Sequence, residues 1–109
     1  MAYQTRLIGR MEKRLPIAIV VRLASVQSQH VNGAELTYTD NVSAHGARVV
    51  SRHAWETGEV LTVTSLKDEI AIRAKVVYCQ QVTGDRYYVG LNFQGLRVTW
   101  ATYATYANS

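Results

Sequence analysis

Two short groups of polar residues in this sequence have types and spacings suited to binding chemistry. The first is Asn41, Ser43 and Gly46, which lies between two strand-like runs. An asparagine amide and a serine hydroxyl can bond to neighbouring backbone or face outward, and glycine permits a positive φ or a close approach of the backbone to a ligand. The second is Arg10 and Arg14, four residues apart and directly before an apolar run. The residues indicate a binding loop with two planar cationic donors. The alternative for the loop is an Asx-type turn before a strand.

Positive charge is concentrated at the beginning of the chain. The net charge is +4, and residues 1–14 alone account for +3. The charged residues of this stretch are Arg6, Arg10, Glu12, Lys13 and Arg14. A groove for long nucleic acid would spread its charge along the body of the fold. The pattern therefore favours a basic arm that meets a compact anion, with Arg6 and Lys13 interpreted as residues of a solvated tail.

The order and spacing of these two groups resemble the PilZ domain, a bacterial receptor module for cyclic di-GMP. In this sequence Arg10 and Arg14 precede the first strand-like run, and the group of Asn41, Ser43 and Gly46 follows the second. Residues 88–93, with the sequence YVGLNF, also resemble the closing strand of that family. The resemblance therefore covers nearly the whole chain.

The resemblance implies that Arg10, Arg14, Asn41, Ser43 and Gly46 contact cyclic di-GMP, and it implies no cofactor besides this ligand. A guanidinium can donate two parallel hydrogen bonds to guanine O6 and N7, pair with a phosphate or stack on a purine. The amide of Asn41 suits a base edge, the hydroxyl of Ser43 adds a contact, and Gly46 keeps the approach open.

Two features of the arm leave alternatives open. Arg6 and Arg10 repeat the spacing of the arginine pair, so the register could slip by four residues, but Arg14 abuts the strand as the family pattern requires. Gly9 stands where family members often carry a bulkier or basic residue, and that position bears on whether one or two nucleotides are bound. The sequence therefore favours Arg10 with Arg14 and leaves the stoichiometry open.

Composition indicates one ordered domain in a reducing compartment. Of the 109 residues, 48% are hydrophobic and 18% charged, which suits a modest core. The single cysteine, Cys79, cannot form an internal disulfide. The early apolar run is short and ends at Arg22, and no run approaches membrane-spanning length. We therefore expect a cytoplasmic protein without membrane insertion.

Alternation of apolar and polar residues predicts six strands and no helix between them. The predicted strands cover residues 15–24, 34–40, 47–53, 59–66, 70–82 and 86–94. Asn32-Gly33 is a strong hairpin signal between the first two. The length of the fifth invites a β-bulge, and we place Tyr78 on its inward face with Ile72 and Val76.

Such a series of strands predicts an all-β fold, a six-stranded antiparallel barrel of split, Greek-key-like form, because closure removes exposed strand edges. Leu96, Trp100, Tyr103 and Ala107 follow at helical spacing and predict a short C-terminal helix packed on the barrel. We thus expect a single domain that consists of a basic arm (residues 1–14), a PilZ-like barrel (15–95) and this helix (96–109).

Catalytic patterns are scarce, so we do not expect an enzyme. His30, His45 and His53 lack metal-ligand spacing, and Ser43 lacks the context of a nucleophile elbow. The interpretation that we favour is a cyclic di-GMP receptor that signals to an unidentified downstream protein when ligand orders the arm.

Two alternatives remain. The first is a ligand-free PilZ-like module that docks proteins. The second is a small barrel for single-stranded nucleic acid, with aromatic stacking platforms and neighbouring arginines. The residues of that second site would be Tyr38, Trp55, Tyr88, Arg48, Arg52 and Arg73.

Overall fold

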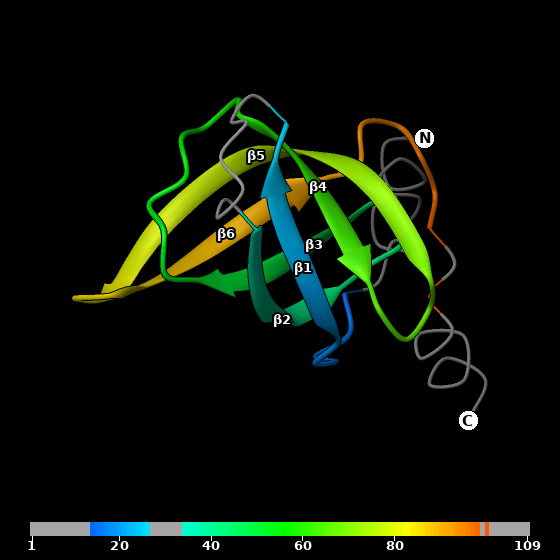
Figure 1. The fold of residues 1–109 in the computed structure, drawn as a ribbon, viewed down its shortest axis with the longest axis horizontal. Coiled ribbons are helices and arrows are strands. Elements are labelled where there is room, and N and C mark those ends of the chain that lie inside the picture. The colour runs from blue at the N-terminus through cyan, green and yellow to red at the C-terminus, as the bar shows by residue number, and fades with distance from the viewer. Residues whose placement is uncertain (1–13, 27–33, 99, 101–109) are drawn as a thin grey trace, which may run out of the picture.

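The computed structural model describes residues 14–26, 34–98 and 100, and within them the protein is an all-β barrel. The strands are β1 (Val20–Ser25), β2 (Ala34–Val42), β3 (Gly46–Ser51), β4 (Val60–Ser65), β5 (Ile70–Thr83) and β6 (Arg86–Asn92). They close in the order β1-β2-β3-β6-β5-β4, and every pairing is antiparallel (Figure 1). The predicted six-stranded antiparallel barrel is confirmed.

The barrel consists of two three-stranded meanders joined along both edges. β1, β2 and β3 form one meander and β4, β5 and β6 the other, while the β3–β6 and β1–β4 ladders close the ring. Figure 1 shows β1 and β4 side by side, with the long β5 arching across the molecule and continuing with β6 into a projecting hairpin. The loop that joins β2 to β3 lies at one end of the barrel.

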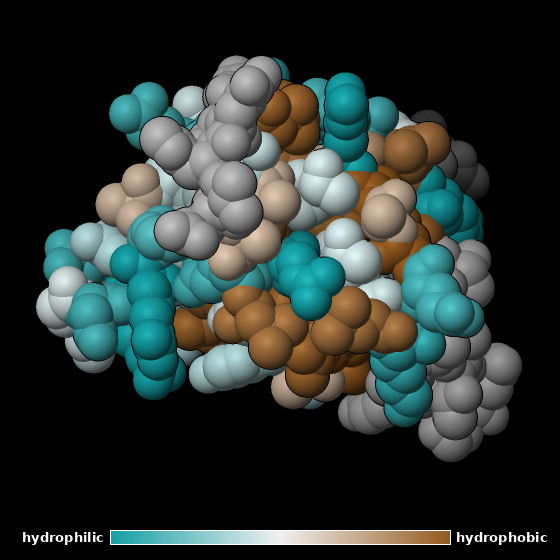
Figure 2. All heavy atoms as spheres, viewed as in Figure 1, coloured by the Kyte–Doolittle hydropathy of each residue, from teal (hydrophilic) through white to brown (hydrophobic). Residues whose placement is uncertain are grey.

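The strands enclose a core of apolar side chains, which the period-two alternation predicted. Val21 and Leu23 of β1 and Val89 and Leu91 of β6 are at most 2% exposed. Fully burying one such side chain stabilises the fold by about 1.5–3 kcal/mol. Some apolar side chains also gather on the outer face over β1 and β2 (Figure 2), where Val20 is 52% exposed and Leu36 63%.

The first predicted strand differs from the structure in residues 15–19. The ladder begins only at Val20, and Leu15 forms an isolated bridge with Val42. Between these points the Thr39 hydroxyl takes over part of the backbone pairing, because it accepts from Ile19 N (2.8 Å) and donates to the Ile17 carbonyl (2.7 Å). The other five strands agree with the prediction to within two residues at each end.

The prediction that Tyr78 faces inward is wrong. The register of β5 against β6 shifts between Val76 and Tyr78, as a β-bulge does, so Tyr78 is 40% exposed while Cys79 packs against the core. The Tyr78 ring instead lies over Gly90, where a Cβ would stand only 2.1 Å from a ring carbon.

The chain after β6 is irregular as far as the structure describes it. Residues 96–98 and 100 form no helix, and the rest of the predicted helix over 96–109 lies outside the described residues, so that helix is not confirmed. Val98 and Trp100 nevertheless belong to the core. The predicted hairpin turn at Asn32-Gly33 also lies outside the described residues. In the described part of the chain, no helix is long and apolar enough to cross a membrane.

Candidate functional site

The polar loop of residues 43–45 joins β2 to β3 and is closed by its own backbone. The N–H of Ser43 donates to the carbonyl of Gly46 at 2.9 Å. The pairing of β2 with β3 shifts register between Thr39 and Asn41, and Asn41 then lies opposite Arg48. This irregularity places the half-buried Asn41 beside the loop at the end of the barrel.

Arg14 lies directly beside this loop. Its Nη1 donates to Asn41 Oδ1 at 3.0 Å, although 27 positions separate the two residues. The neighbouring backbone fixes this approach, since Leu15 N donates to the Val42 carbonyl (2.8 Å) and Val42 N donates to the Leu15 carbonyl (2.9 Å). Arg14 is exposed, and among the described residues only Asn41 accepts a hydrogen bond from its guanidinium.

Gly46 is required for packing and not for an unusual backbone angle. Its φ is not in the positive range. A Cβ at this position would stand 2.4 Å from the carbonyl oxygen of Leu91 on β6, and 3.8 Å from Arg14 Nη2. The close approach that the structure shows is therefore to the Leu91 carbonyl, and an approach of the Gly46 backbone to a ligand stays a prediction.

Ser43 is fully buried, and its hydroxyl serves the loop itself. The oxygen accepts from His45 N at 3.4 Å, and the hydroxyl donates to the Gly46 carbonyl at 3.3 Å. In this structure, Ser43 shapes the loop under Arg14 and Asn41.

The segment that follows β6 donates hydrogen bonds to the backbone carbonyls of this loop. Trp100 Nε1 donates to the Ser43 carbonyl at 3.0 Å. Val98 N donates to the Ala44 carbonyl at 2.7 Å, and Phe93 N donates to the His45 carbonyl at 2.9 Å. This support cannot be read from the sequence, because the partners are about fifty residues apart and the spacing of Trp100 matches a helical stripe.

The other arginine of the predicted pair, Arg10, lies outside the described residues, as do Arg6, Gly9 and Lys13. The structure therefore brings together Arg14, Asn41, Ser43 and Gly46, and the place of Arg10 stays a prediction.

Arg48 forms a separate cluster on the outer face of the barrel. Its Nε donates to Asp40 Oδ2 at 2.7 Å, and its Nη2 bonds to the same oxygen. The guanidinium also lies over the ring of Tyr88, 4.4 Å from the centroid. The hydrogen bond that Arg48 donates to the Asp40 carboxylate raises the pKa of Arg48 above its ordinary value.

This cluster bears on the nucleic-acid alternative. One face of Tyr88 is occupied by Arg48, and Arg48 is already paired with Asp40. Trp55 is only 8% exposed, and its Nε1 donates to Ser51 Oγ at 2.9 Å. Two of the three proposed stacking platforms are thus engaged inside the protein, which argues against that alternative.

The fold and the site define a small antiparallel barrel with an arginine held over a glycine-containing polar loop. A comparison with protein-family models gives a match to the PilZ domain over residues 9–101. The match spans most of the chain, so this protein belongs to the PilZ domain family. A search of curated proteins finds no match.

PilZ is a binding domain and a known module for cyclic di-GMP, not an enzyme family. Among the described residues, histidine, cysteine and acidic side chains form no group of three that could hold a metal ion.

Proposed function

We propose that this chain is a receptor for cyclic di-GMP and that Arg10, Arg14, Asn41, Ser43 and Gly46 form its binding site. The observation that carries the proposal is the contact of Arg14 with Asn41 above Gly46, in a chain that belongs to a family of cyclic di-GMP modules. The ligand carries two guanines and two phosphate charges, which suit a site built from guanidinium and amide groups.

Each residue has a distinct role in this proposal. Arg14 uses its remaining N–H donors on a guanine edge or a phosphate, while Arg10 supplies the second guanidinium. Asn41 accepts from Arg14 through Oδ1, which leaves its Nδ2 donors for the ligand. Ser43 holds the loop in shape, and Gly46 lets β3 lie close to the Leu91 carbonyl of β6 beside Arg14.

Isothermal titration with cyclic di-GMP tests this assignment. We expect tight binding by the intact chain and a loss of several kcal/mol in the Arg10→Ala/Arg14→Ala variant, because charge-assisted hydrogen bonds contribute about 1.5–3 kcal/mol each. Arg73→Ala is the matched control, since Arg73 is an exposed arginine of β5 outside the site. The titration also gives the stoichiometry. No binding by the intact chain would refute the receptor function and favour a ligand-free docking module.

The proposed mechanism is that the nucleotide orders the basic arm of residues 1–14 against the barrel and so changes the surface offered to a downstream protein. It is supported by the +3 charge of this stretch and by the position of Arg14 at its end, beside the loop. Amide hydrogen exchange with and without cyclic di-GMP tests it. Protection of the arm amides is expected, and unchanged exchange despite ligand binding would rule the mechanism out.

A further inference from the structure

β2 and β3 separate at the end of the barrel opposite the Ser43 loop. Their ladder runs from Val42 to Thr39 on β2 and ends at the pair Thr39–Val49. Beyond it β2 stays paired only with β1, and β3 only with β6. Side chains bridge the gap, since the Thr37 hydroxyl donates to the Val50 carbonyl. The separation leaves a groove along the outer face of the barrel.

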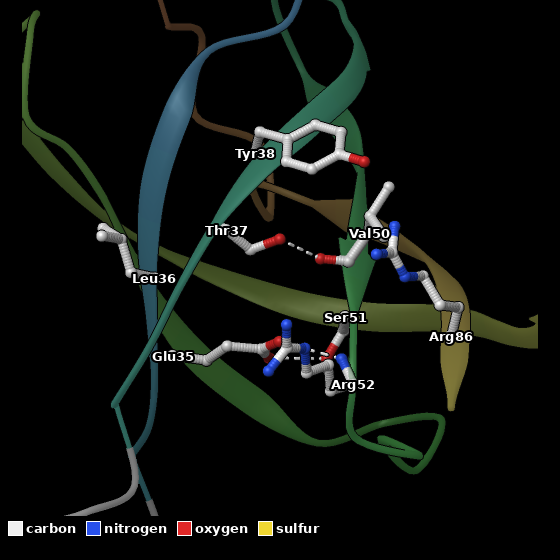
Figure 3. A pocket seen from close by; sticks show the side chains of 8 residues that line it. All are labelled: Glu35, Leu36, Thr37, Tyr38, Val50, Ser51, Arg52 and Arg86. Atoms are coloured by element: carbon white, nitrogen blue, oxygen red, sulfur yellow. Dashed lines mark hydrogen bonds between the residues drawn. The ribbon is translucent and has the colours of Figure 1, made fainter. Parts of the chain in front are cut away.

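This groove, which we call the seam groove, has a polar half and an apolar half. They are two adjoining cavities of about 340 Å³ and about 300 Å³, and both are lined by Tyr38, Val50 and Arg86. The polar half is completed by Glu35, Leu36, Thr37, Ser51 and Arg52 (Figure 3). The apolar half is completed by Val82, Thr83, Tyr87 and Tyr88. The seam groove thus suits a ligand with one polar and one apolar part.

Two arginines of the seam groove have guanidinium groups without a partner in the part of the chain that the structure describes. Figure 3 shows Arg52 and Arg86 reaching toward the polar half from two sides, with the ring of Tyr38 along a third. Within the described residues neither guanidinium forms an ion pair or a hydrogen bond, and neither does the Tyr38 hydroxyl. These groups are therefore available to pair with an anionic group.

The polar half also contains the carboxylate of Glu35, which two hydrogen bonds hold in position. Glu35 Oε1 accepts from Ser51 Oγ at 2.6 Å, and Oε2 accepts from Arg52 N at 2.8 Å. Its charge would repel a ligand with several phosphates, but its oxygens can still accept hydrogen bonds from backbone N–H groups. The lining thus offers the guanidinium groups of Arg52 and Arg86 to an acidic group of a ligand. It also offers the Glu35 oxygens as acceptors for the backbone N–H groups of a peptide.

From these features, we propose that the seam groove docks an extended segment of a partner protein in which an acidic side chain neighbours an apolar or aromatic one. The acidic side chain pairs with Arg52 and Arg86, and its neighbour packs on Tyr38 and Val82. Nucleic acid suits the seam groove less well, because Glu35 lies in the polar half and Arg48 already covers one face of Tyr88.

This docking site is distinct from the proposed nucleotide site and does not depend on it. β2 runs from Ala34 beside the seam groove to Val42 beside the loop, and β3 returns from Gly46 to Ser51. The two sites therefore lie at opposite ends of the same strand pair, and a partner segment can bind whether or not nucleotide is present.

Selection from a phage library of random linear peptides tests the proposal. The full chain serves as bait, and an Arg52→Gln/Arg86→Gln variant serves for counter-selection. We expect selected peptides to share an acidic residue next to an apolar or aromatic one. A synthetic peptide of the selected sequence should bind the double variant about tenfold or more weakly, and bind Arg73→Gln as well as the unchanged chain.

Nuclear magnetic resonance of the ¹⁵N-labelled chain then locates the bound peptide. Shift changes confined to residues 35–38, 50–52 and 82–88 support the proposal, provided that the spectrum of the double variant shows an intact fold. Three outcomes overturn it: no peptide that depends on the two arginines, shift changes elsewhere on the barrel, or displacement of the peptide by single-stranded oligothymidylate that binds more tightly.

Discussion

At the scale of single residues, a close backbone contact explains why position 46 is a glycine. We predict that Gly46→Ala lowers the free energy of unfolding by about 1–3 kcal/mol, because the added Cβ would stand 2.4 Å from the Leu91 carbonyl and the β3–β6 ladder would have to shift. The shift would also move the loop under Arg14 and weaken cyclic di-GMP binding. Urea unfolding and calorimetric titration measure the two effects.

Gly84→Ala is the matched control for that substitution. Gly84 has no atom within 4 Å of a built Cβ, and its φ is not positive. The control should therefore change neither stability nor binding appreciably. Equal destabilisation by the two substitutions would show that the Leu91 contact is not what requires glycine at position 46.

Gly90 differs from Gly46 because its neighbour is a side chain that can move. We predict that Gly90→Ala lowers stability by about 1 kcal/mol, since the Cβ would overlap the Tyr78 ring and displace it. In a Tyr78→Ala background, the same change should be neutral or stabilising, because alanine is better than glycine inside a strand by roughly 0.5–1 kcal/mol. A double-mutant cycle by urea unfolding measures the coupling, and additive effects would contradict the ring-over-glycine contact.

At the scale of elements, the Ser43 loop depends on a segment from the far end of the chain. We predict that Trp100→Phe weakens cyclic di-GMP binding and lowers stability by about 1–3 kcal/mol, because the buried Ser43 carbonyl loses the hydrogen bond from Trp100 Nε1. Trp55→Phe is a matched control that removes a comparable indole hydrogen bond, to Ser51. The control should lower stability similarly and leave binding unchanged, as titration and urea unfolding can show. If both variants bind equally well, the support from Trp100 does not matter for binding.

The sequence predicted most elements because alternation is a local signal. The bounds of five strands follow from it, and so does a barrel that leaves no open edge. The prediction from alternation was wrong where contacts between residues distant in the sequence replace or shift the regular pairing of strands. The Thr39 hydroxyl displaces the strand start to Val20, and the bulge against β6 turns Tyr78 outward. The length of the fifth strand indicated a β-bulge but not its position, and nothing in the neighbouring sequence indicates the Thr39 contacts.

The candidate site was predictable in part for the same reason. Residue types and order pointed to Arg14, Asn41 and Gly46, which the structure brings together. The burial of Ser43 and its bond to Trp100 depend on how the chain closes on itself, so spacing alone could not reveal them.

At the scale of the whole molecule, most of the net charge and the apolar core belong to different segments of the chain. The barrel is stabilised by buried apolar side chains, whereas the net charge is concentrated in residues 1–14. Raising the salt concentration from about 0.1 M to about 1 M shortens the Debye length from about 10 Å to about 3 Å. We therefore predict that cyclic di-GMP binding weakens several-fold over this range while the barrel keeps its stability.

Titrations and urea unfolding at both salt concentrations measure these two quantities. The stability of the barrel should change by less than about 1 kcal/mol, because a half-buried surface ion pair such as Arg48–Asp40 contributes only about 0–1 kcal/mol. The Arg10→Ala/Arg14→Ala variant should lose most of the salt dependence of any residual binding. If the affinity for cyclic di-GMP does not change with salt, the arm does not attract the nucleotide through its charge, and contacts with the loop must carry the binding.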